Sequence, residues 1–185
     1  MKKILLTSLL VSATFVSPAF AFDENDAKKV YDDRIASWAT APTVISAIKA
    51  QNEQTADYDQ AKIDELDKKW QSDDATIIDP VINNDLSKEL KSVVDTSNSY
   101  FAEIFVMDAK GLNVGTSAKT SDYWQGDEAK WQKTFQVGAG SVDIGDVKFD
   151  ESSQSYTRQL SFPVMDGETP IGAVTVSINA DFLPE

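Results

Sequence analysis

The sequence predicts an α+β fold in which N-terminal helices pack on a five-stranded antiparallel sheet. Two observations lead to this fold class. Apolar residues recur at helical spacing as far as about Ser99, whereas from Tyr100 onward short β-branched and aromatic runs alternate with turn residues. With 42% hydrophobic and 25% charged residues, the 185-residue chain has the composition of a globular protein.

The first 21 residues have the features of a secretory signal peptide. Lys2 and Lys3 form a positive start, residues 4–16 are apolar, and residues 19–21 (AFA) fit a cleavage site. The apolar stretch is shorter than the roughly 20 residues that a membrane span needs. We therefore expect cleavage after Ala21 and a periplasmic or secreted protein that is not embedded in a membrane.

Residues 22–185 are expected to form one domain, with a helical part over 22–99 and a sheet and pocket part over 100–185. The first helix is predicted over 24–39, and Thr40-Ala41-Pro42 should interrupt it. Three further helices are predicted, and Asp79-Pro80 should form a turn before the last. The apolar positions that define these three helices are Val44, Ile45 and Ile48; Ile63, Leu66 and Trp70; and Leu86, Leu90, Val93 and Val94.

The second part of the chain contains five predicted strands and one short helix. The strands are expected over 104–107, 112–116, 142–149, 156–165 and 171–178. Turns at 108–111 and 166–170 suggest that the strands follow one another as a meander, and Gly145 suggests an irregular third strand. The helix is expected over 127–135, with Asp127 as its N-cap.

Charge and composition exclude several classes of function. The chain has 30 acidic and 17 basic residues, a net charge of -13, which argues against binding to nucleic acid. It contains no cysteine and no histidine, so disulfides, thiolate nucleophiles and histidine-based triads or metal sites are excluded. The acidic residues do not follow the spacing of a calcium-binding EF-hand loop, and a solvated surface explains them better. The acidic residues considered for calcium are Asp73, Asp74, Asp143, Asp146, Asp150 and Glu151.

Four segments of the second part resemble the Cache sensor domains, also called PDC folds. They are residues 105–111 (FVMDAKG), 120–131 (TSDYWQGDEAKW), 159–166 (QLSFPVMD) and 171–174 (IGAV), and the spacing is similar to the single-Cache type. These PAS-like domains are extracytoplasmic ligand-binding modules of bacterial chemoreceptors and sensor kinases. The resemblance implies helices on one face of a five-stranded antiparallel sheet, a small-ligand pocket on the other, and recognition without catalysis or a cofactor.

The sequence also departs from a complete receptor. The chain ends at Glu185, without the second membrane span and signalling domain of a chemoreceptor. We therefore expect a stand-alone sensor module that binds a small ligand and takes part in signal transduction, such as chemotaxis. A membrane chemoreceptor or sensor kinase is the expected protein partner.

Aromatic side chains are the first candidates for the pocket wall. Tyr123, Trp124 and Trp131 lie close together in the sequence, with Lys130 among them. Aromatic rings with a polar tip suit a small-ligand pocket, and the resemblance favours Tyr123 and Trp131 as walls. The same residues could instead be core residues that attach the loop to the sheet.

A carboxylate ligand would need a positive partner, and two are candidates. Arg158 has the planar fork that suits a carboxylate, but strand alternation puts it on the same face as Leu160 and Phe162. Gln159 shares the opposite, polar face with Thr157 and Ser161, and this face is the better candidate for the pocket. Lys130 is the alternative to Arg158.

The fifth strand indicates the ligand class. Cache domains that bind amino acids or amines resemble one another in an Asp near the end of this strand, and Ser177 stands there in this chain. The missing negative charge favours a neutral or anionic ligand, a small carboxylate such as acetate, propionate, pyruvate or lactate. Thr175 shares a face with Ser177 and could also donate a hydrogen bond.

Two other functions remain open from the sequence. The chain could be a periplasmic interaction protein that docks on a membrane sensor and binds no small ligand. It could also be a hydrolase, but then Glu or Lys would have to replace histidine as the general base.

Overall fold

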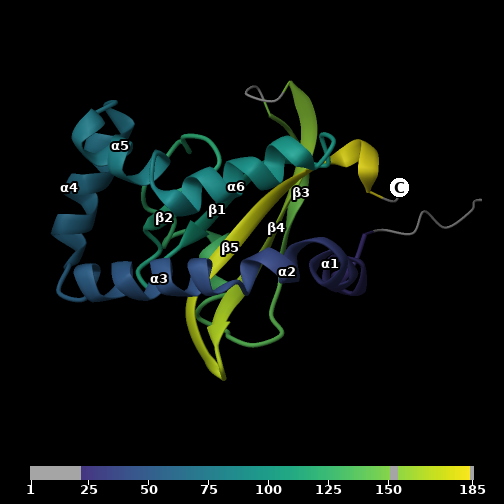
Figure 1. The fold of residues 1–185 in the computed structure, drawn as a ribbon, viewed down its shortest axis with the longest axis horizontal. Coiled ribbons are helices and arrows are strands. Elements are labelled where there is room, and N and C mark those ends of the chain that lie inside the picture. Colours follow the sequence, from purple (N-terminus) through teal and green to yellow (C-terminus); the bar gives the residue numbers. More distant parts are fainter. Residues whose placement is uncertain (1–21, 151–153, 184–185) are drawn as a thin grey trace, which may run out of the picture.

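Five strands form one antiparallel sheet with the order β2-β1-β5-β4-β3 (Figure 1). A computed structural model describes residues 22–150 and 154–183, so the predicted signal peptide over 1–21 lies outside the described residues. The strands are β1 (Phe101–Met107), β2 (Asn113–Thr116), β3 (Asp143–Asp150), β4 (Ser155–Asp166) and β5 (Thr169–Asn179). The predicted fold class, helices on a five-stranded antiparallel sheet, is confirmed.

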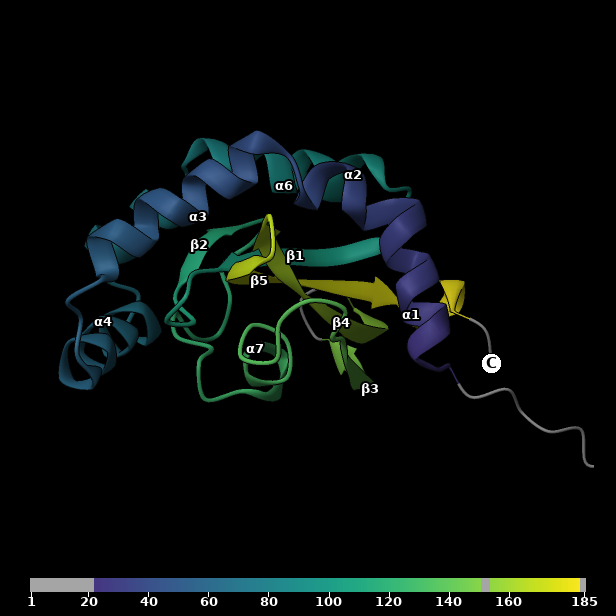
Figure 2. The same ribbon diagram turned by 90° about the horizontal axis from the view of Figure 1, so that it is seen from below.

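Helical residues 36–39, 42–55 and 85–96 lie over one face of the sheet, and a short helix over residues 129–132 lies on the other (Figure 2). The α-helices are α1 (Glu24–Val30), α2 (Ala36–Ala39), α3 (Pro42–Thr55), α4 (Gln60–Gln71), α5 (Ala75–Ile82), α6 (Asp85–Thr96) and α7 (Ala129–Gln132). A π-helical turn, η1 (Tyr31–Ile35), joins α1 to α2, and a 3₁₀ turn, η2 (Ala180–Phe182), follows β5. None of the helices in the described part of the chain is long and apolar enough to cross a membrane.

Local sequence explains where the main helices begin. Asp23 accepts hydrogen bonds from the backbone N–H groups of Asn25 and Asp26 and so caps α1. Pro42 occupies the first turn of α3, where its missing N–H is not needed. The Asn84 side chain caps α6 in the same way as Asp23 caps α1.

The main hydrophobic core lies between the sheet and α1, α2, α3 and α6. Alternation along β5 directs Val174, Val176 and Ile178 into this core, and β4 contributes Leu160 and Phe162. The opposite face of the same strands therefore consists of a second set of residues, which is largely polar and forms the candidate site.

Three predictions of local structure are wrong. Asp79-Pro80 is not a turn, because Pro80 lies inside α5, where Ile78 and Val81 are buried and hold the helix against its neighbours. Asp127 is not the N-cap of α7; Glu128 holds that position without a side-chain cap. The strands also do not form a meander, because β5 inserts between β1 and β4.

Candidate functional site

A cavity of about 480 Å³ lies on the face of the sheet that the main helix layer leaves free. Strands β1, β5, β4 and β3 form its floor, and the segment between β2 and α7 forms its roof, on the side where α7 is seen in Figure 2. We call it the sheet-side cavity. It is lined by Glu103, Phe105, Lys119, Thr120, Ser121, Gln125, Glu128, Lys130, Gly145, Asp146, Lys148, Phe149, Asp150, Thr157, Gln159 and Ser177.

A row of polar side chains crosses the floor of the sheet-side cavity. Glu103 on β1 is paired with Ser177 on β5, and Ser177 is paired with Gln159 on β4. The Gln159 Nε2 lies 3.4 Å from the Ser177 Oγ. Residues paired across neighbouring strands point to the same face, so the register brings these three groups together.

A second row lies further along the same face, beneath α7. Here the hydroxyl oxygens of Ser161 and Thr175 are 2.9 Å apart, and both residues are buried. Neither residue lines the cavity. The structure thus brings Gln159 and Ser177 to the cavity and places Ser161 next to them in the sheet.

Lys130 places a positive charge in the cavity wall. Its Nζ lies 2.9 Å from a carboxylate oxygen of Glu128 and 3.2 Å from the Oε1 of Gln125. The side chain is 15% exposed, and the ammonium lies 5.4 Å from the centre of the Phe105 ring. Burial among these groups holds the ammonium in one place, which a surface lysine would not achieve.

Glu103 is the most unusual acid of the cavity. The pKa of its carboxyl group is raised to about 7, chiefly by burial and also by the negative charge of Asp150, while the positive charge of Lys130 acts in the opposite direction. Among the described residues, no hydrogen bond or ion pair to the Glu103 side chain is found. Sequence analysis missed this residue, although a glutamate within the otherwise apolar run FAEIFVM was a signal that could have identified it.

The predicted aromatic wall lies outside the cavity. Trp131 is 8% exposed and packs against Phe105, Met107 and Ala173, and its ring stacks on Phe135. Its indole Nε1 donates a hydrogen bond to the backbone carbonyl of Asp108 at 3.1 Å. Trp131 therefore attaches its own helix, α7, which also carries Lys130, to the sheet.

The other two aromatic candidates attach the same loop to the rest of the protein. Tyr123 is buried, its ring stacks on Trp70, and burial raises the pKa of its hydroxyl group. The Nε1 of Trp124 donates to the carbonyl oxygen of Lys110 at 2.8 Å. The Oδ1 of Asp67 on α4 accepts the backbone N–H groups of both residues. These contacts fix the roof of the cavity from outside.

Arg158 lies on the helix side of the sheet. Its guanidinium group is 5.1 Å from the centre of the Phe22 ring, and its strand neighbour Leu160 on the same face belongs to the main core. The structure does not bring Arg158 into the sheet-side cavity. Of the two positive partners that the sequence suggests, Lys130 is the one that reaches it.

Asp108 connects the helix layer to the β1–β2 turn. Its carboxylate accepts hydrogen bonds from the backbone N–H groups of Lys110 and Leu112, from the Thr55 hydroxyl and from the Gln51 amide. Burial raises the pKa of this carboxyl group, and these hydrogen bonds oppose the rise. Because the Asp108 carbonyl also accepts from Trp131, the turn links α3 to the helix that carries Lys130.

Replacing Thr55 with valine should lower the free energy of unfolding by about 1.5–3 kcal/mol, since a buried carboxylate loses a hydrogen bond. The Thr55 hydroxyl lies 2.9 Å from the Asp108 Oδ2. Thr96→Val is the matched control: both threonines end a helix and bond back one turn, but Thr96 is exposed. Urea denaturation measures the free energy of unfolding of both variants, and equal losses would show that the hydrogen bond to Asp108 does not contribute to stability.

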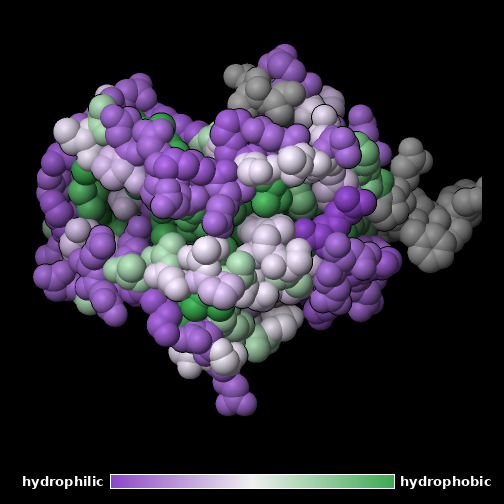
Figure 3. Space-filling model, in the orientation of Figure 1, coloured by the Kyte–Doolittle hydropathy of each residue, from purple (hydrophilic) through white to green (hydrophobic). Residues whose placement is uncertain are grey.

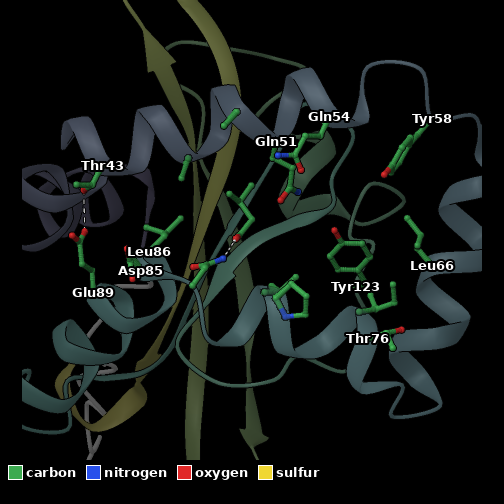
Figure 4. A pocket seen from close by; sticks show the side chains of 17 residues that line it. Thr43, Gln51, Gln54, Tyr58, Leu66, Thr76, Asp85, Leu86, Glu89 and Tyr123 are labelled. Carbon is green, nitrogen blue, oxygen red and sulfur yellow. Dashed lines mark hydrogen bonds between the residues drawn. The ribbon is translucent and has the colours of Figure 1, made fainter.

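A second cavity, of about 530 Å³, lies between the helices, and we call it the helix-side cavity. Figure 3 shows hydrophobic side chains in a hollow between α3 and α6. In Figure 4, Thr43 and Glu89 are hydrogen-bonded to each other at one end, and Tyr58 and Tyr123 lie at the other. With no lysine or arginine in its lining, this space offers an anion no positive partner.

Across residues 22–150 and 154–183, no group of three or more acidic side chains is arranged to hold a metal ion.

No protein-family model and no curated protein matches the sequence. Solved structures with a similar arrangement include the ligand-binding domain of the Campylobacter jejuni chemoreceptor Tlp3 in complex with 4-methylisoleucine. The two sequences are 14% identical, and the match covers 85% of this chain and 57% of the Tlp3 chain, with a TM-score of 0.39. The sensor domain of the V. cholerae histidine kinase DctB is 15% identical, with 85% and 56% coverage and a TM-score of 0.39.

The ligand-binding domain of the Pseudomonas aeruginosa PAO1 amino acid chemoreceptor PctC, in complex with GABA, is also similar. The two sequences are 16% identical, and the match covers 84% of this chain and 62% of the PctC chain, with a TM-score of 0.38. The chain thus spans about three fifths of the length of these three structures. They are sensor domains of chemoreceptors and of a histidine kinase, the two classes of protein that the sequence resemblance names. At TM-scores below 0.5, any inference about the ligand depends on the cavity of this chain.

Proposed function

We propose that the chain is an extracytoplasmic sensor domain that binds a small carboxylate in the sheet-side cavity. The observation that carries the proposal is the position of Lys130, a mostly buried cation in the wall of a cavity whose floor is polar. An ammonium group has three donors, and Glu128 and Gln125 accept from two of them. The third is then available for a ligand oxygen.

Neutral polar groups complete the proposed site. Ser177, Gln159 and Thr157 line the floor beneath Lys130 and can donate hydrogen bonds to a carboxylate or to the oxygen of a pyruvate or lactate type of ligand. Phe105 supplies an apolar wall for a short carbon chain. At about 480 Å³ the cavity lies in the lower part of the range of roughly 300–1,000 Å³ for small-molecule sites.

The direct test is a ligand panel against the wild-type protein, read by thermal shift and by isothermal titration calorimetry. Acetate, propionate, pyruvate and lactate should stabilise the protein, by about 2.7 kcal/mol for a ligand at a hundredfold excess over its Kd. The corresponding amides, acetamide, propionamide and lactamide, are matched controls without the negative charge and should give little or no shift. A response to amines but not to acids would contradict the proposed ligand class.

The alternative is an interaction protein that docks on a membrane sensor and binds no small ligand. The helix-side cavity favours it, because hydrophobic side chains lie in the hollow between α3 and α6 (Figure 3). No thermal shift with any small molecule, together with specific co-purification of a membrane sensor, would support this alternative.

A further inference from the structure

Glu103 lines the proposed site, and none of the described residues is paired with its carboxyl group. It lies directly across the sheet from Ser177, one strand away from Gln159, and lines the cavity that Lys130 also lines. No hydrogen-bond donor satisfies it within the part of the chain that the structure describes. Half-buried polar groups usually have hydrogen-bond partners, so the carboxyl group of Glu103 can form a hydrogen bond with a ligand in this cavity.

We propose that Glu103 binds the ligand as a neutral acid, donating its O–H to the ligand's carboxylate, so that binding of the anion takes up one proton. This inference rests on the proposed function, since it requires an anionic ligand. A carboxylate beside an ionised Glu103 would be repelled, whereas a protonated Glu103 forms a short O–H···O⁻ hydrogen bond with it. One proton therefore accompanies each bound anion whenever Glu103 is ionised in the free protein.

The charges around Glu103 are consistent with this assignment. From β3, Asp146, Lys148 and Asp150 line the cavity; from the segment between β2 and α7 come Lys119 and Glu128, and from α7 comes Lys130. Lys130 is bound to Glu128 and Lys119 to Asp73, so two of the three cations already have acidic partners. Burial and the nearby Asp150 raise the pKa of Glu103 to about 7.

The sign of the pH dependence follows from linkage. Below about pH 7, Glu103 is already neutral and the affinity for a carboxylate is constant; above it, each unit of pH lowers the affinity about tenfold, because a proton must be taken up. The chain has no histidine, so no imidazole titrates in this range. From pH 6.0 to pH 8.5 the affinity should fall about thirtyfold.

The experiment is calorimetric titration of the wild-type protein with the best carboxylate of the panel at pH 6.0, 7.0 and 8.5. Titrations at pH 8.5 in two buffers of different ionisation enthalpy count the protons directly, and we expect about one per ligand. Glu103→Gln keeps a hydrogen-bond donor but cannot titrate, so it should bind with an affinity near the wild-type value at pH 6.0 and show no pH dependence. Asp146→Asn is the matched control, since it removes an exposed acid of the same cavity and should leave the thirtyfold fall unchanged.

The outcomes separate the two proposals. If carboxylates bind but no proton is taken up, or if Glu103→Gln keeps the wild-type pH dependence, the role of Glu103 is wrong and the carboxylate site remains. If Glu103→Gln abolishes binding, and amines bind more tightly as the pH rises, Glu103 is an anionic partner for a cation and both proposals fail. If no carboxylate binds at any of the three pH values, the proposed function itself is wrong. The proton count is made on the wild-type protein, so it does not depend on whether the variant folds.

Discussion

Replacing Trp131 with alanine is expected to lower the free energy of unfolding by about 3–5 kcal/mol, the usual cost of removing a buried tryptophan side chain. The indole is 8% exposed, packs in one cluster with Phe105, Met107 and Ala173, and donates a hydrogen bond to the Asp108 carbonyl. Its loss would leave a void under α7. Urea or guanidinium denaturation, with the slope checked for a change in the denatured state, measures the effect.

Trp131→Phe is the matched control for the packing contribution. It keeps an aromatic ring in the cluster but loses the hydrogen bond to Asp108 and part of the volume, so the loss should be clearly smaller than for alanine. A loss below about 1 kcal/mol for Trp131→Ala, accompanied by a large loss of ligand affinity, would instead identify Trp131 as a pocket wall. That result would support the sequence-based prediction over the packing in the structure.

Replacing Lys130 with methionine should weaken carboxylate binding about a hundredfold, because removing one partner of a buried charge pair costs about 2–5 kcal/mol and each 1.4 kcal/mol is tenfold. Methionine keeps a long apolar stem over Phe105 and removes the charge. The loss should appear mainly as faster dissociation. Calorimetry at pH 6.0 measures the affinity, and a denaturation curve of the same variant confirms that it folds.

Two matched controls show whether the position of the charge matters. Lys119→Met removes another cation of the same cavity, one that is bound to Asp73 and is 34% exposed, and should weaken binding by much less. Arg158→Gln removes the second positive candidate, which lies on the helix side, and should leave affinity unchanged. Loss of binding in Arg158→Gln with normal binding in Lys130→Met would place the ligand elsewhere.

The sequence predicts most elements of the fold because their signals are local. The apolar spacing of the first helix and the Asp23 cap depend on neighbouring residues, and the helix forms over 24–39 as expected, with a π-helical turn inside it. The order of the strands in the sheet could not be predicted in this way. The placement of β5 between β1 and β4 depends on contacts between distant residues, which no local pattern encodes.

The candidate site was less predictable for the same reason. Alternation along β4 separates Gln159 from Arg158, and the structure puts the two on opposite sides of the sheet as that pattern requires. The aromatic residues could not be assigned from sequence, because rings serve both cores and pocket walls. Glu103 could not be identified as a candidate site residue from the sequence, because its position beside Ser177 and its raised pKa near Asp150 depend on residues that lie far away in the chain.

The position of β5 has a consequence for the order of folding. β1 and β2, and also β3, β4 and β5, pair with their neighbours in sequence, whereas the pairing of β1 with β5 joins Phe101 to Ile178. Closing so long a loop is slow, so the halves of the sheet should form before they join. The proposed carboxylate site is therefore completed only when the two halves of the sheet join, because Glu103 comes from one half and Ser177 and Gln159 come from the other.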